Sequence, residues 1–215
     1  AFLPHKFVDH THSTPFLVLA NLPDAKKIVE DLFGDTIAVV PYVMPGFALA
    51  KLAADTFEKS PKVEGLLLEK HGHFTWGTDA KISYDRVIEQ TNKVENWIKK
   101  RRKKNHFQSL LPDKDAKEGL VDNLQAALRR VSEEDSPSFV FRIIDTPEIV
   151  SQINEHIKND MTDQGVATPD HVIRLKSKPL VLKRIDFEKG VEKIEQTILK
   201  FVQDYKDYFL SWSAN

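Results

Sequence analysis

Short apolar runs alternate with helically spaced apolar positions along the first hundred residues. Two runs rich in leucine or β-branched residues, at 36–40 and 65–69, have the length and composition of buried strands. Further strands are predicted at 5–10 and 74–76, and capping, proline and glycine signals predict helices at 14–20, 24–33, 45–53 and 79–98. This alternation predicts an α/β fold of α/β/α layers, in which helices cover both faces of a sheet.

The rest of the chain is more polar and predicts a small C-terminal α/β extension. Helices are expected at 118–131, at 146–157, after Thr168-Pro169 and at 187–209, and strands at 139–144 and 180–182. Polar segments at 105–118 and 132–137 suggest boundaries between parts of the chain. The pattern divides the chain into 1–105, a linker and helix at 106–137, and the extension at 138–215.

Composition and charge narrow the function classes. The chain has 215 residues, 41% apolar and 29% charged, which is typical of a folded globular protein. Its net charge of −1 gives no overall attraction to nucleic acid or anionic membranes, and no apolar run reaches the roughly 20 residues that cross a bilayer. The absence of cysteine excludes disulfides and thiolate zinc sites, and it fits a cytoplasmic location.

A basic run at 99–104 stands apart from this balanced charge. We interpret it as a solvated helix end, whose cations suit the negative pole of the helix dipole. Contact with nucleic-acid phosphates ranks last among the alternatives, because no aromatic side chains interleave the charges.

The histidines carry the most visible chemistry. His10 and His12 are two residues apart, so in a strand they point to the same face, and His71 follows an apolar run. Three imidazoles with an open position are a known way to hold a catalytic divalent metal. Asp9 is a candidate to fix an imidazole tautomer, and Gly72 would allow close backbone approach.

Four sequence blocks then resemble a known family. They are Val8-Asp9-His10-Thr11-His12, Val40-Pro41-Tyr42-Val43-Met44-Pro45-Gly46-Phe47, His71-Gly72-His73-Phe74-Thr75-Trp76-Gly77 and Thr168-Pro169-Asp170-His171-Val172-Ile173-Arg174. Their order is similar to that of the class II aldolase/adducin family, closest to the aldolase half of bifunctional rhamnulose-1-phosphate aldolase/alcohol dehydrogenase proteins. The resemblance implies that His10, His12 and His71 bind zinc or another divalent ion. It also implies that residues 1–105 are the later, C-terminal part (the back part) of an aldolase-like domain.

The implied reaction is aldol cleavage of a ketose 1-phosphate to dihydroxyacetone phosphate and an aldehyde. The family's catalytic Glu and phosphate loops precede the first histidine pair, so we expect this chain to be a fragment of a protein with a dehydrogenase domain and to lack activity by itself. Glu69 is a weak catalytic candidate, interpreted more readily as a strand-end surface residue. Asp170, His171 and Arg174 are weak candidates for substrate binding, against the alternative of a short capped helix.

Several alternatives stay open. His73 is a fourth polar group in the site, a rival to His71, or a strand residue facing the other layer, and we favour a nearby non-ligand. The chain could instead be a non-catalytic, adducin-like structural module, or a related sugar-phosphate epimerase or decarboxylase. The resemblance also implies a phosphorylated ketose substrate and a homo-oligomer.

Overall fold

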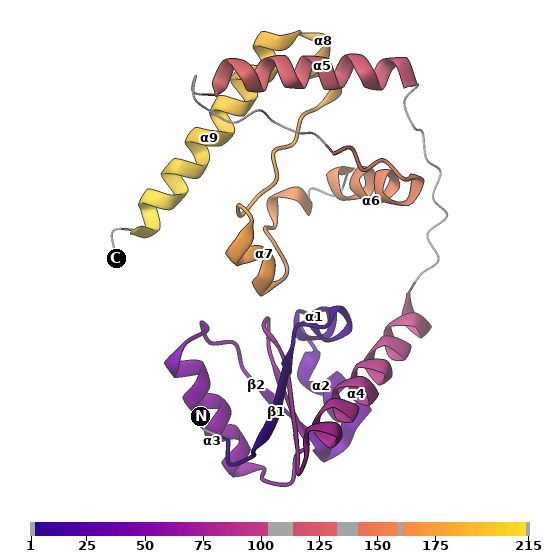
Figure 1. Ribbon diagram of the computed structural model, residues 1–215, viewed down its shortest axis with the longest axis vertical. Helices are drawn as coiled ribbons and strands as arrows, with labels where there is room; N and C mark the ends of the chain where they lie inside the picture. The colour runs from indigo at the N-terminus through magenta and orange to yellow at the C-terminus, as the bar shows by residue number, and fades with distance from the viewer. Residues whose placement is uncertain (1–2, 103–113, 133–141, 159–160, 214–215) are drawn as a thin grey trace. The chain divides into compact units, whose positions relative to one another are not determined.

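The computed structural model describes residues 3–102, 114–132, 142–158 and 161–213, and the chain divides into two compact units (Figure 1). The first unit consists of Ala1–Lys104 and Val166–Leu175, and the second of Asn105–Gly165 and Lys176–Asn215. A short segment far along the sequence therefore belongs to the first unit. None of the helices in the described ranges is long and apolar enough to cross a membrane.

A four-stranded sheet forms the centre of the first unit. Its strands are β1 (Phe7–Thr11), β2 (Ile37–Val40), β3 (Gly65–Leu68) and β4 (Gly72–Gly77). The spatial order is β1-β4-β3-β2, with β2 and β3 parallel and the other two pairs antiparallel. All four strands were predicted from the apolar pattern, and their observed ends differ from the expected ones by a few residues.

Helices lie on both sides of this sheet, which confirms the α/β class (Figure 1). One side carries α1 (Thr14–Ala20), α2 (Ala25–Phe33) and α4 (Ala80–Arg101), and the other carries α3 (Phe47–Lys59); a 3₁₀ turn, η1 (Gly34–Thr36), leads into β2. Leu67 packs into the first apolar cluster, whereas Leu66 and Leu68 pack into the second. The alternation of side chains along β3 thus feeds two cores.

The helix boundaries follow the local signals closely. Asp79 caps α4 by accepting a hydrogen bond from the Ile82 amide at 2.9 Å. The N-cap of α1 is Ser13 rather than the expected Thr14. Of the basic run, Lys99 pairs with Glu95 at 3.0 Å and Arg101 lies over the ring of Trp97. The last two lysines of that run lie outside the described residues.

The described part of the second unit is helical. It contains α5 (Lys114–Val131), α6 (Pro147–Lys158), the 3₁₀ turn η2 (Met161–Asp163), α8 (Arg184–Glu188) and α9 (Val191–Ser213). Ala127 of α5 and Ile194 and Ile198 of α9 form its buried core. The helix α7 (Pro169–Arg174) lies in the segment that belongs to the first unit.

The structure differs from the expectations for this region at four places. The helix predicted from 118 begins at Lys114, and the helix predicted at 187–209 is divided into α8 and α9 at Gly190, which has a φ of 87°. No strand forms at 180–182, where Leu180 and Leu182 are partly buried and pack against the helical core instead of pairing with another strand. At 142–144 the chain is also irregular, while 139–141 lie outside the described residues.

Candidate metal centre

His10 lies in β1, and His12, one residue past the end of that strand, places its ring beside the ring of His10. His10 lies opposite Phe74 in the antiparallel pair, and the two rings stack with centroids 4.1 Å apart. His12 follows immediately after the end of β1, with its ring centroid 4.8 Å from that of His10. Register and stacking therefore fix the ring of His10, whereas His12 lies beyond the last strand residue and depends on other contacts.

His71 reaches this pair from the tight turn between β3 and β4. Lys70 adopts a left-handed conformation with φ of 55°, and the His71 amide donates to the Leu68 carbonyl at 3.1 Å. The ring centroid of His71 lies 5.2 Å from those of both other histidines. One ring nitrogen from each of the three residues lies within 4.8 Å of the others, a group that could bind a metal.

Gly72 provides the space for this cluster. A Cβ at that position would lie 2.7 Å from Cδ2 of His12 and 3.0 Å from Cε1 of His10. It would also lie 2.7 Å from the Thr11 carbonyl oxygen, a backbone atom that cannot rotate away. The expected close backbone approach at Gly72 is therefore present, and it is the two imidazoles that occupy the space.

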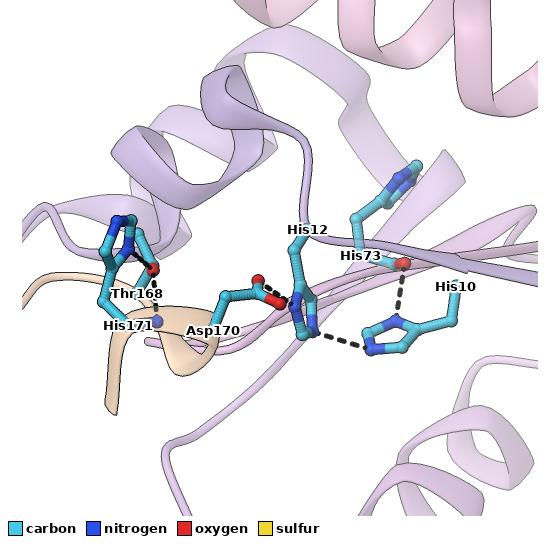
Figure 2. Close-up of polar contacts among 6 residues, drawn as sticks. All are labelled: His10, His12, His73, Thr168, Asp170 and His171. Atoms are coloured by element: carbon cyan, nitrogen blue, oxygen red, sulfur yellow. Dashed lines mark hydrogen bonds and ion pairs between the residues drawn. The ribbon is translucent and has the colours of Figure 1, made fainter. Parts of the chain in front are cut away.

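Hydrogen bonds to Nδ1 define the orientation of two rings (Figure 2). The Nδ1 atom of His10 lies 3.0 Å from the backbone carbonyl oxygen of His73, and that of His12 lies 2.8 Å from Oδ2 of Asp170. A carbonyl or carboxylate oxygen only accepts, so each Nδ1 carries the proton. In the neutral rings, both Nε2 atoms then present lone pairs.

These two Nε2 atoms lie 3.0 Å apart, facing each other. Two lone pairs at that distance repel each other unless a proton, as in an N–H···N hydrogen bond, or a metal ion lies between or beside them. Two nitrogens bound to one tetrahedral zinc ion at 2.0–2.1 Å would be about 3.3 Å apart, close to the observed separation. The Nδ1 atom of His71 is buried without a hydrogen-bond partner. The arrangement therefore fits a divalent metal.

The surroundings of His10 and His71 favour the neutral imidazole, which is the form that binds metal. Desolvation lowers the pKa of His10, and the neighbouring rings of His12 and His71 add to that effect, although the hydrogen bond to the His73 carbonyl opposes it. Desolvation also lowers the pKa of His71, with a smaller contribution from His12.

The side chain of His73 lies on the opposite face of the sheet. Its ring is 0% exposed, stacks on Phe16 at 3.8 Å and hydrogen-bonds Gln90 through Nε2 at 2.6 Å. Burial lowers the pKa of His73 to about 4. Of the three readings left open by the sequence, the structure places His73 as a strand residue facing the other layer.

Two other sequence candidates do not join the cluster. Asp9 alternates with His10 along β1 and faces the side of Thr75, so it does not contact either Nδ1. Glu69, the weak catalytic candidate, directly follows the end of β3 and lies in the turn that leads to β4. Glu69 is not among the side chains whose ligand atoms group with the three histidines.

The helix α7 brings only one of its three candidates to the histidines. Asp170 contacts His12, and that hydrogen bond, more than the nearby Arg174, lowers the pKa of the Asp170 carboxyl. His171 turns to its own helix cap, where its ring contacts the Thr168 hydroxyl (Figure 2). The cap-then-proline signal placed Asp170 in the first helical turn, but nothing in the sequence indicated that it lies against His12.

Two family models match the chain, one in each half. Residues 1–97 match the "Class II Aldolase and Adducin N-terminal domain", and residues 116–215 match "Aldolase class II, second domain". The second match includes the range that contains Asp170.

The chain is also similar to individual proteins. The chain is 31% identical over 219 residues to a Bacillus subtilis protein described as "Uncharacterized oxidoreductase YuxG". That alignment covers 97% of this chain and 31% of the relative, so the chain spans about a third of the relative's length. Among solved structures, a class II aldolase domain from Thermoplasma acidophilum is 38% identical, with a TM-score of 0.41 over 45% of this chain and 44% of that one. The putative aldolase/epimerase/decarboxylase YgbL from Klebsiella pneumoniae is 22% identical, with a TM-score of 0.35 over 41% and 46%.

Proposed function

We propose, from the premise that this chain belongs to the class II aldolase and adducin family, that His10, His12 and His71 hold a catalytic divalent metal, zinc in the first instance. The reaction that we propose for the whole protein is aldol cleavage of a ketose 1-phosphate of the rhamnulose-1-phosphate type. Its products would be dihydroxyacetone phosphate and an aldehyde.

The observation that carries the proposal is the 3.0 Å approach of the two Nε2 atoms of His10 and His12. Each ring has its Nδ1 proton committed to an oxygen acceptor, so in the neutral rings both facing nitrogens are electron-pair donors. A third imidazole lies within reach of both. Three neutral donors around one point are the ligand set of a catalytic zinc site with a position open to substrate.

The bound metal and the residues around the histidines would have different roles. A bound divalent ion would act as a Lewis acid toward the carbonyl and hydroxyl oxygens of the sugar. Phe74 holds the ring plane of His10, and Gly72 leaves room for His10 and His12 on the same side of the hairpin. Among the described residues, no carboxylate joins the metal-ligand group of the three histidines, and the proposed reaction also needs a proton-transfer residue and phosphate-binding residues. We propose that the whole protein supplies them from outside the described residues.

Metal content tests the ligand assignment. The purified chain, loaded with zinc and freed of excess by gel filtration, should carry one equivalent by elemental analysis. Substitution of any of the three ligands by alanine should reduce the zinc content, and H12A is expected to reduce it most clearly. H171A is a matched control, because His171 contacts its helix cap rather than the cluster. A chain that holds no metal would contradict the proposal and favour a non-catalytic, adducin-like module.

Substrate specificity requires the full-length protein. With rhamnulose 1-phosphate, it should release dihydroxyacetone phosphate, and the release should stop with H10A or after chelation. Formation of an epimer or of carbon dioxide instead would assign the site to another reaction. The same assay on the 215-residue chain tests the fragment hypothesis, since robust turnover would refute it.

The Bacillus relative is described as an oxidoreductase, and this chain covers 31% of it. That description supports a second part of the proposal, in which the full-length protein joins the aldolase to a dehydrogenase. The full-length protein should then reduce or oxidise a nicotinamide cofactor in the presence of the aldehyde product. The absence of any cofactor turnover with that aldehyde would contradict this part alone and leave the metal site untouched.

A further inference from the structure

We propose that Asp170 is a positioning residue for the metal centre: it holds the ring of His12 in the tautomer and orientation that leave Nε2 free for a cation. The inference rests on the proposed function of His12 as a ligand. It goes beyond that function because Asp170 comes from a segment 158 residues further along the chain.

The contact lies on the side of the ring away from the other histidines. Oδ2 of Asp170 is 2.8 Å from Nδ1 of His12, while Nε2 of the same ring faces His10 (Figure 2). The two nitrogens of an imidazole point in divergent directions, so a carboxylate at Nδ1 stands behind the ring with respect to Nε2. Asp170 therefore acts on the metal centre through His12 rather than as a ligand.

His12 needs such a partner more than His10 does. His10 lies within β1, stacks on Phe74 and donates to a main-chain carbonyl. His12 lies one residue past the end of that strand, where the β1–β4 ladder no longer pairs its backbone. A hydrogen-bonded carboxylate is the usual means of fixing the tautomer and orientation of a metal-binding histidine.

The segment that carries Asp170 is itself anchored. The side-chain amide of Asn21, at the C-terminal end of α1, donates to the Ala167 carbonyl at 3.0 Å and to the Leu17 carbonyl at 2.8 Å. One residue later Thr168 caps α7, which sets Asp170 in the first helical turn. The carboxylate is therefore held by a fixed backbone rather than by a free loop.

An ion pair between Asp170 and His12 that played no part in the metal centre would have different consequences from a positioning contact. The Asp170 side chain is 53% exposed, so the pair contributes little to the free energy of unfolding. If the contact were only that, its removal would change neither the affinity for metal nor the tautomer of His12. The two readings can therefore be separated by measurements other than stability or activity.

The test uses D170A and D170N, with D55N as the matched control. Asp55 is also an exposed carboxylate with a partner at 2.8 Å, but that partner is Lys51 on α3, away from the histidines. Zinc affinity is measured by competition with a chromophoric chelator. The tautomer of each histidine is read in the metal-free chain from long-range proton–nitrogen NMR correlations.

We expect the dissociation constant for zinc to rise about 10–100-fold in D170A. The rise should be smaller in D170N, whose amide oxygen still accepts from Nδ1, and D55N should match the wild type. In D170A the proton of His12 should redistribute between Nδ1 and Nε2, while His10 keeps its proton on Nδ1. An unchanged zinc affinity together with an unchanged His12 tautomer in D170A would overturn the inference.

Failure of the proposed function gives a different result. If the wild type binds no zinc, the ligand assignment falls, and the metal-free tautomer of His12 still decides whether Asp170 positions the ring. Because Asp170 is exposed, D170A is expected to fold. Should it not, D170N keeps the shape of the side chain and provides both measurements.

Discussion

The Nδ1 atom of His10 donates to the backbone carbonyl oxygen of His73 at 3.0 Å. The same residue, His73, turns its side chain to the opposite face of the sheet and buries it against Phe16. A main-chain group thus sets the tautomer of one ring in the cluster, and no side-chain substitution at position 73 removes it.

This relationship predicts that H73Q keeps its metal. The variant loses the stacking on Phe16 and the short contact with Gln90, so its free energy of unfolding should fall by about 1–3 kcal/mol. Zinc content should remain at one equivalent and His10 should keep its proton on Nδ1. Loss of zinc from a folded H73Q would instead make His73 a ligand and contradict its placement on the far face.

The stability of the chain should depend on pH through His73. Its pKa is about 4 in the folded chain, against 6.5 when unfolded. Between these values the unfolded chain binds a proton that the folded chain does not, so stability is lost as the pH falls from 6.5 to 4. The contribution of His73 is on the order of 3 kcal/mol.

Urea unfolding of the wild type and H73Q across this pH range measures that contribution. The wild type should lose more stability on acidification than H73Q, since the variant has no imidazole to protonate at this position. Parallel curves for the two proteins would mean that His73 does not titrate with a lowered pKa. The other histidines remain in both proteins and cancel in the comparison.

Substitution of Gly72 by alanine should disturb the cluster directly. The added methyl group would meet His12 and the Thr11 carbonyl at 2.7 Å, so the rings and the turn must shift. We expect a loss of about 1–3 kcal/mol in the free energy of unfolding and at least a tenfold weaker affinity for zinc.

Gly119 provides the control for Gly72. It lies in α5 with nothing within 4 Å of an added Cβ, so G119A should keep wild-type zinc affinity and gain about 0.5–1 kcal/mol of helix stability. Equal zinc affinities for G72A and G119A would show that space at the turn does not control the site.

Metal should stabilise the folded chain by mass action. At free zinc 100-fold above the dissociation constant, the free energy of unfolding should rise by about 2.7 kcal/mol, because the unfolded chain lacks the assembled site. Thermal unfolding with zinc and with a chelator measures the difference. H12A should respond weakly and H171A like the wild type; an equal response in H12A would exclude His12 from the site.

Much of the first unit could be predicted from local patterns. The strands β2 and β3 follow from continuous apolar runs, and α4 from helical spacing behind a capping Asp79. The prediction failed where apolar residues are few, since the pattern at Leu180 and Leu182 predicted a strand, but these residues are partly buried against helices. A short apolar run indicates burial without saying what covers it.

The sequence by itself determined the α/β class and the three histidines that meet, since a two-residue spacing fixes a strand face and an apolar run fixes a buried strand. Only the tertiary structure decided the rest. The antiparallel register placed the His73 carbonyl at His10 and sent the His73 ring to the other side, and α7 brought Asp170 to His12 across 158 residues. Such contacts depend on long-range packing, which local periodicity does not encode.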